Sequence, residues 1–296
     1  MVKLMSKCIV IGAGPGGMSA AIYLKRAGID VILIEKMVPG GEMLKTNKIE
    51  NYLGFDSIDG GELALRMSSQ VKDLGVEIIR DDITDISYDN GFIVTGLKNK
   101  YQADYVIIAT GRVPRKLGLD MEEELLNRGI SYCATCDGAF YKGKEVAIVG
   151  GGDSALTEAL YLSDICLKVY VLVRKDLKAS DILQNRVKNK DNIVILKNVS
   201  VSQFISSDSL TGVLLNDGRK LDVNGLFVAI GGTPDISFLK KLNVDTINGY
   251  IKTDDKMRTN IKGLYAVGDV RYKDFYQIIT AASDGAIAAL SIREDD

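Results

Sequence analysis

The sequence of 296 residues contains no histidine and no tryptophan, and it has only four cysteines and four prolines. Without histidine, Ser-His-Asp and Cys-His catalysis are excluded, as is any metal site that depends on imidazole. Proton transfer must then be carried out by Asp, Glu, Lys, Tyr, Cys or water. The few cysteines therefore become the first candidates for chemistry.

The sequence also lacks an excess of charge and a long apolar run. It has 37 Lys and Arg residues against 39 Asp and Glu residues, so nothing indicates a nucleic acid or an anionic membrane as a partner. No apolar run approaches the roughly 18 residues of a spanning helix. The first residues run directly into a predicted strand, without the apolar region and cleavage site of a signal peptide. We therefore expect a cytoplasmic protein, long enough for two domains.

Two of the cysteines, Cys133 and Cys136, lie two residues apart in the stretch SYCATCDG. In a cytosolic α/β chain this spacing indicates a redox-active dithiol, because the thiolate is the nucleophile of disulfide exchange. Asp137 follows directly, where a carboxylate can relay a proton to or from a thiol. The alternative is half of a zinc site, but a second ligand pair is needed and only Cys8 and Cys166 remain.

A dinucleotide-binding fingerprint occupies the start of the chain. A buried strand at 7–11 precedes the turn GAGPGG at 12–17, and a helix over 16–27 and a strand over 31–34 follow. The strand ends in Glu35, 23 residues after Gly12. At this separation in the sequence a carboxylate accepts a hydrogen bond from a ribose hydroxyl of the nucleotide. Together these elements predict a nucleotide site, with the pyrophosphate at the N-terminus of the helix.

The next hundred residues have weaker signals. A long loop with glycines at 40 and 41 is followed by a predicted helix over 60–74. Short alternating segments between 76 and 104 predict a small β-meander, and the apolar run at 105–109 predicts a buried return strand.

The same pattern then recurs. A strand at 144–149 precedes GGGDSA at 150–155, and a helix and a strand at 169–173 follow at the same offsets as in the first copy. The residue that matches Glu35 is Val173, followed by Arg174 and Lys175. A carboxylate would repel a 2′-phosphate whereas cations attract it, so this second site favours NADP. The alternative is a solvated basic turn.

The second copy is followed by its own β-segments and a return strand near 226–230. A further strand at 263–270 and an apolar helix at 275–292 arrive after the second unit is complete. We therefore expect the C-terminal segment to finish the first domain, so that one domain is inserted into the other. The two crossings are expected at 113–114 and 231–234.

With these motifs in order, the whole chain resembles the low-molecular-weight, bacterial-type thioredoxin reductases. The resemblance is carried by GAGPGG at 12–17, GGE at 40–42, EN at 50–51, ATG at 109–111, SYCATCDGAF at 131–140, GGGDSA at 150–155 and GLYAVGDV at 263–270. It implies an α/β fold of two Rossmann-like nucleotide-binding domains, one inserted into the other. Residues 1–113 and 242–296 would form the FAD-binding domain, and residues 114–241 an NAD(P)H-binding-like domain that carries the disulfide.

The resemblance also implies the parts of the site. The FAD pyrophosphate would lie on 12–17, its ribityl chain near Asp269 and its flavin end near Gln277. Cys133 and Cys136 would form the redox disulfide, with Cys133 for the protein partner, Cys136 for the flavin and Asp137 as acid/base. The implied FAD contacts are Gly12, Gly14, Pro15, Gly16, Gly17, Glu35, Lys36, Gly40, Gly41, Glu42, Asn51, Ile83, Ala109, Thr110, Gly111, Gly268, Asp269, Tyr276, Gln277 and Ile278. The implied NADPH contacts are Gly150, Gly152, Asp153, Ser154, Ala155, Arg174, Lys175 and Lys178, and no metal is expected.

The chain departs from the family pattern in three places. The family's NADPH stretch is commonly His-Arg-Arg-x-x-x-Arg, whereas residues 173–178 read VRKDLK. Tyr276 stands where an arginine usually precedes the glutamine, and Glu42 where a glutamine is usual. We expect a homodimeric, flavin-dependent enzyme that passes electrons from NADPH to thioredoxin or a thioredoxin-like protein. A ferredoxin-fed reductase with a degenerate NADPH site and a redox-sensing flavoprotein remain as alternatives.

Overall fold

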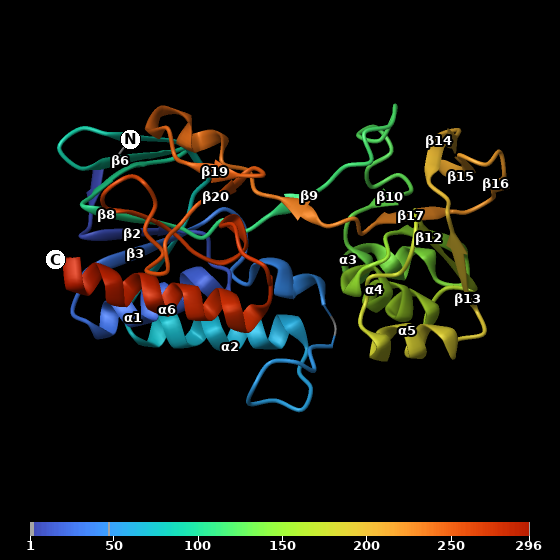
Figure 1. Ribbon diagram of the computed structural model, residues 1–296, viewed down its shortest axis with the longest axis horizontal. Coiled ribbons are helices and arrows are strands. Elements are labelled where there is room, and N and C mark those ends of the chain that lie inside the picture. The colour runs from blue at the N-terminus through green and yellow to red at the C-terminus, as the bar shows by residue number, and fades with distance from the viewer. Residues whose placement is uncertain (1–2, 47, 296) are drawn as a thin grey trace. The chain divides into compact units, whose positions relative to one another are not determined.

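The computed structural model describes residues 3–46 and 48–295 (Figure 1), and these form two compact units. The first unit contains the residues up to Leu44, Lys48–Val113 and the residues from Thr233 onward. The second consists chiefly of Pro114–Gly232. Within the described ranges, no helix is long and apolar enough to cross a membrane.

A parallel five-stranded sheet forms the centre of the first unit. Its order is β21 (Leu264–Ala266), β8 (Tyr105–Ile108), β2 (Cys8–Ile11), β3 (Val31–Glu35) and β4 (Glu77–Arg80). All four residues of β2 are buried. Such a continuous apolar run is typical of a parallel strand that is covered on both faces.

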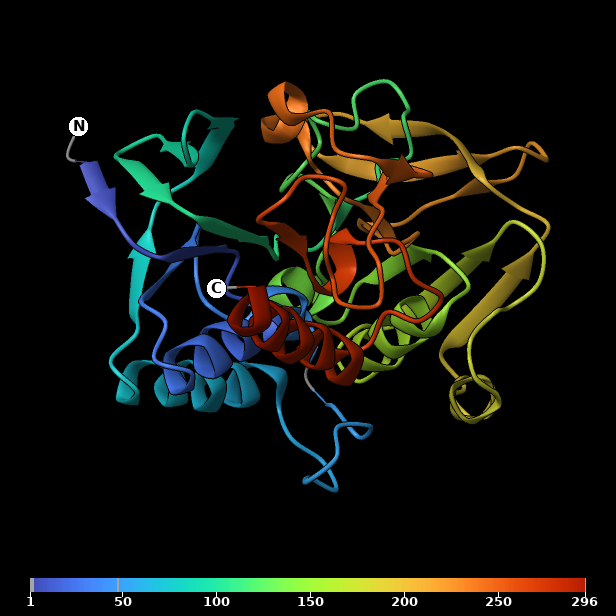
Figure 2. The same ribbon diagram turned by 60° about the vertical axis from the view of Figure 1, so that its left-hand side comes forward.

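Three helices cover one face of this sheet: α1 (Pro15–Arg26), α2 (Gly60–Asp73) and α6 (Ile278–Asp295) lie side by side in both views (Figures 1 and 2). Helix α6 approaches α1 closely at Gly285, where an added Cβ would lie 2.1 Å from the carbonyl oxygen of Gly16. Asp59 caps the N-terminus of α2, because its carboxylate accepts a hydrogen bond from the backbone N–H of Glu62 at 3.0 Å. The C-terminal helix therefore completes the first unit, as expected from the sequence.

An antiparallel layer covers the other face. It comprises β5 (Ile83–Tyr88), β6 (Phe92–Gly96) and β7 (Lys100–Ala103), with β1 (Lys3–Met5) parallel to β7. A 3₁₀ helix, η3 (Ser237–Leu242), packs against β5 and buries Phe238 and Leu239 in the same core. This packing corrects the expected domain boundary at 241/242, because residues 233–241 belong to the first unit.

The second unit repeats this design. Its parallel sheet has the order β10 (Ile130–Ser131), β17 (Gly225–Val228), β11 (Glu145–Val149), β12 (Lys168–Val173) and β13 (Ile193–Lys197). Helices α3 (Ala134–Asp137), α4 (Asp153–Ser163) and α5 (Asp181–Lys188) lie on one side of it in Figure 1. The antiparallel strands β14 (Val201–Ser206), β15 (Leu210–Leu215) and β16 (Lys220–Leu221) lie on the other.

The pairing registers display the internal repeat directly. Cys8 pairs with Val31 in the first sheet, and Val146 pairs with Val169 in the second, so both pairs are 23 residues apart (31 − 8 and 169 − 146). The prediction of two Rossmann-like domains is confirmed. One detail of the expected meanders was wrong: β4 and β13 add to the parallel sheets as edge strands, because each follows a helix that returns the chain to that sheet.

The chain passes between the units twice. The two crossings form a short ladder of β9 (Val113–Pro114) and β18 (Gly232–Thr233), and the N–H of Arg115 donates to the carbonyl of Gly231 at 2.9 Å. The remaining short elements of the first unit are η1 (Gly41–Lys45), β19 (Thr246–Ile247), β20 (Tyr250–Ile251) and η4 (Gly268–Val270), and η2 (Gly138–Tyr141) belongs to the second.

Candidate redox and nucleotide-binding sites

The carboxyl edge of the first sheet gathers residues from four distant segments. Gly12 follows β2, Glu35 ends β3, the triplet 109–111 follows β8, and Asp269 lies three residues beyond the end of β21. Because parallel strands end at the same edge, loops far apart in sequence meet there. The edge is the place where the fold admits a dinucleotide.

The turn after β2 needs glycine for two reasons. Gly12 has a φ of +103°, and an added Cβ would lie 2.4 Å from the carbonyl oxygen of Ala109. At Gly17 an added Cβ would lie 1.8 Å from the carbonyl oxygen of Gly12, so helix and strand could not pack as they do. Gly14 differs, since an added Cβ would meet no atom within 4 Å. The open side at Gly14 is a cradle that a ligand can enter.

Glu35 holds this turn in shape. Its Oε2 accepts a hydrogen bond from the N–H of Ala13 at 2.7 Å, and its Oε1 accepts from the N–H of Met37 at 2.9 Å. Lys36 points elsewhere, to an ion pair with Asp82 at 2.9 Å. The turn and the acid at the end of β3 thus form one hydrogen-bonded unit.

The loops around 40–51 and 268–278 contribute further predicted residues. The N–H of Gly40 donates to the carbonyl of Ala13 at 2.8 Å, which brings the loop 40–42 to the glycine turn. Asn51 donates from Nδ2 to Oε1 of Gln277 at 3.1 Å. Ile83 lies in β5 and is partly buried against the core of the first unit. Ile278 begins α6.

Arg112 is a part of this site that the sequence reasoning missed. Its Nη2 donates to Oδ2 of Asp269 at 2.8 Å, and its guanidinium carbon lies 4.5 Å from the ring centroid of Tyr276. Burial raises the pKa of Asp269, and the negative charge of Glu42 raises this pKa further. The positive charges of Arg112 and Lys273 lower it but do not cancel the effect of burial. Its place in the sequence could have indicated it, because Arg112 directly follows the ATG motif and so lies at the carboxyl end of β8, where the other site residues gather.

A second missed group supports the turn that carries Asp269. The Oδ2 of Asp284, on α6, accepts hydrogen bonds from the N–H of Gly268 and from Nζ of Lys273, both at 3.0 Å. Nη1 of Arg271 lies 3.2 Å from the other carboxylate oxygen. Because Asp284 and Lys273 are almost fully buried, this network fixes the turn at 268–269 firmly.

These residues fit the FAD that the sequence resemblance implies. Gly14 leaves open space beside the N-terminus of α1, where a pyrophosphate binds. Thr110 adds an observation of its own: its Oγ1 is buried and has no hydrogen-bond partner among the described residues. A buried hydroxyl of this kind is a ready partner for a polar ligand group.

The carboxyl edge of the parallel sheet in the second unit carries the corresponding glycine turn. Gly150 follows β11, and at Gly152 an added Cβ would again meet no atom within 4 Å. The loop after β12 folds against this turn, because the N–H groups of Lys178 and Ala179 donate to the carbonyl of Gly151 at 2.7 and 3.1 Å. Asp153 accepts from the N–H of Ser180 at 2.7 Å. The loop's side chains at Arg174, Lys175 and Lys178 are exposed, as is Ser154, whereas Ala155 is buried in α4.

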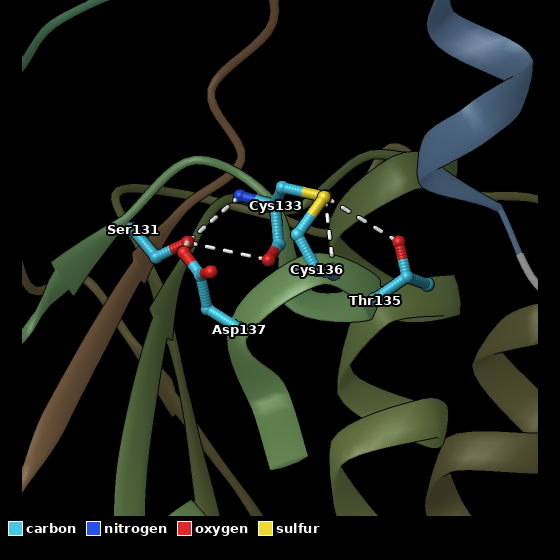
Figure 3. The surroundings of a disulfide bond; sticks show 5 residues. All are labelled: Ser131, Cys133, Thr135, Cys136 and Asp137. Atoms are coloured by element: carbon cyan, nitrogen blue, oxygen red, sulfur yellow. Dashed lines mark hydrogen bonds between the residues drawn. A yellow bond between two sulfur atoms is a disulfide. The ribbon is translucent and has the colours of Figure 1, made fainter. Parts of the chain in front are cut away.

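The predicted disulfide lies at the same edge of the second sheet. Cys133 and Cys136 are joined, with their Cα atoms 5.3 Å apart, and they follow β10, two strands away from β11 (Figure 3). The N–H of Cys136 donates to Sγ of Cys133 at 3.2 Å, and Oγ1 of Thr135 lies 3.4 Å from the same sulfur. These donors favour a thiolate at Cys133 once the bond is reduced.

Asp137 is held by a residue that the sequence reasoning did not single out. The hydroxyl of Ser131 donates to Oδ2 of Asp137 at 2.7 Å, and it accepts from the N–H of Cys133 at 3.0 Å (Figure 3). The carboxylate and the first cysteine are thereby connected through one side chain. The only signal in the sequence was the place of Ser131 in the SYCATC motif.

The other two cysteines have different surroundings. Cys8 and Cys166 are buried, unpaired thiols. Burial raises the pKa of the Cys166 thiol to about 11 and that of Cys8 well above its ordinary value, so neither forms a thiolate readily. The described part of the chain contains no cluster of three or more candidate metal ligands.

Comparison with known proteins agrees with this geometry. Residues 6–285 match the family model of pyridine nucleotide-disulphide oxidoreductases. A thioredoxin reductase from Listeria monocytogenes is 44% identical over 95% of this chain and 90% of its own length. The crystal structure of thioredoxin reductase from Lactococcus lactis has a TM-score of 0.94 and 38% identity, covering 98% of both chains. A ferredoxin-flavin thioredoxin reductase from Clostridium acetobutylicum has a TM-score of 0.56 and 30% identity, covering 99% of both chains.

The chain belongs to the thioredoxin reductase family. This confirms the family predicted from the motifs, together with the assignment as a flavin-dependent disulfide oxidoreductase. Thioredoxin reductases of this kind use FAD and NADPH. The roles of the individual site residues remain predictions.

Proposed function

We propose that this chain is a thioredoxin reductase that takes electrons from NADPH and delivers them through FAD and the Cys133–Cys136 disulfide to thioredoxin. The observation that carries the proposal is the position of that disulfide at the carboxyl edge of the second sheet, the edge that also holds the glycine turn at 150–152. A redox disulfide at the same sheet edge as a nucleotide turn is the arrangement expected of an enzyme, because a purely structural disulfide needs no nucleotide turn at its edge of the sheet.

The first unit would hold FAD through its glycine turn, Glu35, Thr110 and the Gly268–Asp269 turn. When bound, FAD supplies two-electron transfer between a nicotinamide and a disulfide. The chain's own contribution there is to leave space at Gly14, to present the hydroxyl of Thr110 and to fix Asp269 with Arg112.

The second unit would carry out thiol–disulfide exchange. In the reduced enzyme, the thiolate of Cys133 attacks one sulfur of the oxidised thioredoxin, whose disulfide breaks, and the departing thiolate takes a proton. Cys136 then attacks the sulfur of Cys133, the mixed disulfide breaks, and the second thioredoxin thiol is released. Two electrons pass to thioredoxin, and Asp137 would supply and recover the protons.

NADPH is the proposed donor because the second unit keeps what a nucleotide needs. The open position at Gly152 leaves room for a pyrophosphate, and Arg174, Lys175 and Lys178 are exposed on the loop that follows β12. Two features favour the ferredoxin alternative: Val173 replaces the usual histidine, and Lys175 cannot form the bidentate fork of an arginine with a phosphate. Three cationic side chains on one loop should still attract a 2′-phosphate more than the loss of one bidentate arginine contact weakens its binding. NADPH is therefore the donor we propose first.

We also propose that the enzyme is a homodimer that works in the cytoplasm. The family resemblance supports both statements, and a compartment that keeps thiols reduced suits a disulfide whose function is to cycle. Sedimentation of the FAD-loaded protein tests the oligomeric state: a species of about twice the monomer mass is expected, and a monomer at micromolar concentration contradicts it.

The donor is tested by mixing the oxidised, FAD-loaded protein anaerobically with NADPH, NADH or reduced ferredoxin and following the flavin absorbance. NADPH should bleach the flavin rapidly and at lower concentration than NADH. No bleaching by millimolar NADPH together with rapid bleaching by reduced ferredoxin would establish the alternative donor. Bleaching without any turnover of oxidised thioredoxin would instead indicate a sensor.

A further inference from the structure

Ser131 is a buried polar residue at the end of β10, with 3% of its surface exposed. Its Oγ lies 2.7 Å from Oδ2 of Asp137, 3.0 Å from the backbone nitrogen of Cys133 and 3.2 Å from the carbonyl oxygen of Cys133 (Figure 3). A hydroxyl with three polar neighbours in so small a space cannot change one contact without affecting the others.

The capacity of a hydroxyl group limits these contacts. A serine side chain has one hydrogen to donate and two lone pairs to accept. The N–H of Cys133 occupies one lone pair, which leaves one hydrogen and one lone pair for the carboxyl of Asp137 and the carbonyl of Cys133. Two complete arrangements follow from this count.

In the first arrangement Asp137 is ionised, and the hydroxyl donates its hydrogen to the carboxylate. In the second Asp137 carries a proton and donates it to the free lone pair of Ser131, whose own hydrogen turns to the carbonyl of Cys133. The carbonyl of Cys133 also accepts a hydrogen bond from the N–H of Asp137 at 3.2 Å, so the hydroxyl of Ser131, the N–H and the carbonyl of Cys133 keep a partner in both arrangements. The carboxyl can therefore change its protonation state without leaving a buried group unpaired, which would be costly.

We propose that Ser131 is a positioning residue for proton transfer, which holds Asp137 in one place while that carboxyl gives and recovers a proton during exchange at the cysteines. The proposal rests on the proposed function, since it needs Asp137 to act as the acid/base. Among the described residues, Ser131 is the side chain that hydrogen-bonds to Asp137. The nearby hydroxyl of Thr135 faces Sγ of Cys133 instead.

The proton balance can be followed through one exchange. The thiolate of Cys133 attacks a partner disulfide, a sulfur–sulfur bond forms, the partner's bond breaks, and its leaving thiolate takes the proton of Asp137. The ionised Asp137 now accepts a hydrogen bond from the hydroxyl of Ser131. It recovers a proton from the thiol of Cys136, which attacks the sulfur of Cys133 and releases the second partner thiolate. Two thiols of the enzyme are oxidised and one partner disulfide is reduced.

Acid assistance has a signature that a structural role lacks. An aliphatic thiolate is a poor leaving group and benefits from a proton, whereas the acidic aromatic thiolate released from 5,5′-dithiobis(2-nitrobenzoate) leaves without one. The loss of a proton donor should therefore slow exchange with an aliphatic disulfide selectively. Distortion of Cys133 should slow exchange with both probes alike.

The experiment uses the FAD-loaded protein, reduced anaerobically with dithiothreitol, freed of it, and mixed with bis(2-hydroxyethyl) disulfide or the aromatic probe. Quenched samples are alkylated and the free thiols are counted by mass. Ser131→Ala should slow exchange with the aliphatic probe about tenfold, which is less than the roughly hundredfold or more of a complete acid–base group because Asp137 itself remains, and exchange with the aromatic probe by less than about twofold. The Ser131→Thr and Ser131→Val pair is the matched control, because both have the same shape and only threonine keeps the hydroxyl.

Asp137→Asn should show the same selectivity, and adding Ser131→Ala to it should cause no further loss. Equal slowing of both probes, no slowing of either, or a further loss in the Asp137→Asn background would overturn the proposal. If Ser131→Ala does not fold, the Thr and Val variants decide in the same way. The assay needs neither NADPH nor thioredoxin, so its result does not depend on the proposed function. Failure of the wild-type protein to reduce thioredoxin with NADPH would refute the proposed function, and only the two disulfide probes decide the role of Ser131.

Discussion

The guanidinium carbon of Arg112 lies 4.5 Å from the ring centroid of Tyr276. The same guanidinium donates to Asp269 at 2.8 Å. The ring of Tyr276 and the carboxylate of Asp269 therefore share one positive charge, which comes from another segment, directly after the ATG motif. A guanidinium suits this place because it can stack on a ring and form an ion pair at the same time.

Arg112→Ala should weaken FAD binding about tenfold, because it removes the counter-charge of a partly buried carboxylate and the partner of the Tyr276 ring. Arg112→Lys should lose less, since it keeps the charge but not the planar stack. The FAD dissociation constant, measured by the quenching of flavin fluorescence on binding, tests this. Equal FAD affinity in wild type and Arg112→Ala would show that the pair has no role at the flavin site.

The two open glycines give a matched pair of variants. An added side chain at Gly14 or Gly152 meets no atom within 4 Å of its Cβ, so both variants should fold. Gly14→Val should abolish FAD binding, whereas Gly152→Val should keep FAD and lose NADPH-driven bleaching. Flavin content after purification and stopped-flow bleaching are the measurements. The opposite assignment, or full FAD content in Gly14→Val, would contradict the division of roles between the two units.

The loop after β12 should distinguish NADPH from NADH. Arg174→Ala should raise the NADPH concentration needed for half-maximal bleaching about ten- to hundredfold, the usual cost of a charged hydrogen bond, with little change for NADH. Lys190→Ala is the control, because Lys190 pairs with Asp164 at 2.6 Å in the same unit, away from this loop. An equal response to NADPH and NADH in Arg174→Ala would show that the cations do not contact a 2′-phosphate.

Thr135 should influence the reactivity of Cys133. Its Oγ1 lies 3.4 Å from Sγ of Cys133, so Thr135→Val should slow alkylation of the reduced Cys133 at neutral pH by about threefold, a little under the net contribution of an ordinary hydrogen bond. Peptide mass mapping after timed exposure to iodoacetamide separates the four cysteines. Cys8 and Cys166 should stay unmodified in the folded protein, and modification of either before Cys133 would contradict the account of their burial.

Sequence reasoning succeeded where one residue type has one physical reason to be present. Glycine at 12 was predicted from the tight turn, and its φ of +103° confirms the turn. The repeat was read from equal spacings, and the registers of both sheets repeat them. The C-x-x-C pair was predicted to be joined, and the structure contains that disulfide.

Contacts between distant segments could not be predicted in the same way. Arg112 and Tyr276 are 164 positions apart (276 − 112), and neither residue suggests the other until the strands β8 and β21 are neighbours. In the sequence, Ser131 is one more position in a motif. Only the structure shows that it is buried and that its one hydrogen and two lone pairs are shared among Asp137 and the backbone of Cys133. The domain boundary was misplaced because η3 is apolar on the side that packs against β5, which has no signature in its sequence.

The central claim is that electrons from NADPH leave the protein through Cys133 and Cys136. The direct test is anaerobic mixing of NADPH and excess oxidised thioredoxin with wild type, Cys133→Ser, Cys136→Ser and the control Cys166→Ala. Each FAD-loaded protein should be bleached by NADPH, wild type and Cys166→Ala should form thioredoxin dithiol at equal rates, and both serine variants should form none. Thioredoxin reduction by either serine variant, or its absence in the wild type despite bleaching, would contradict the account.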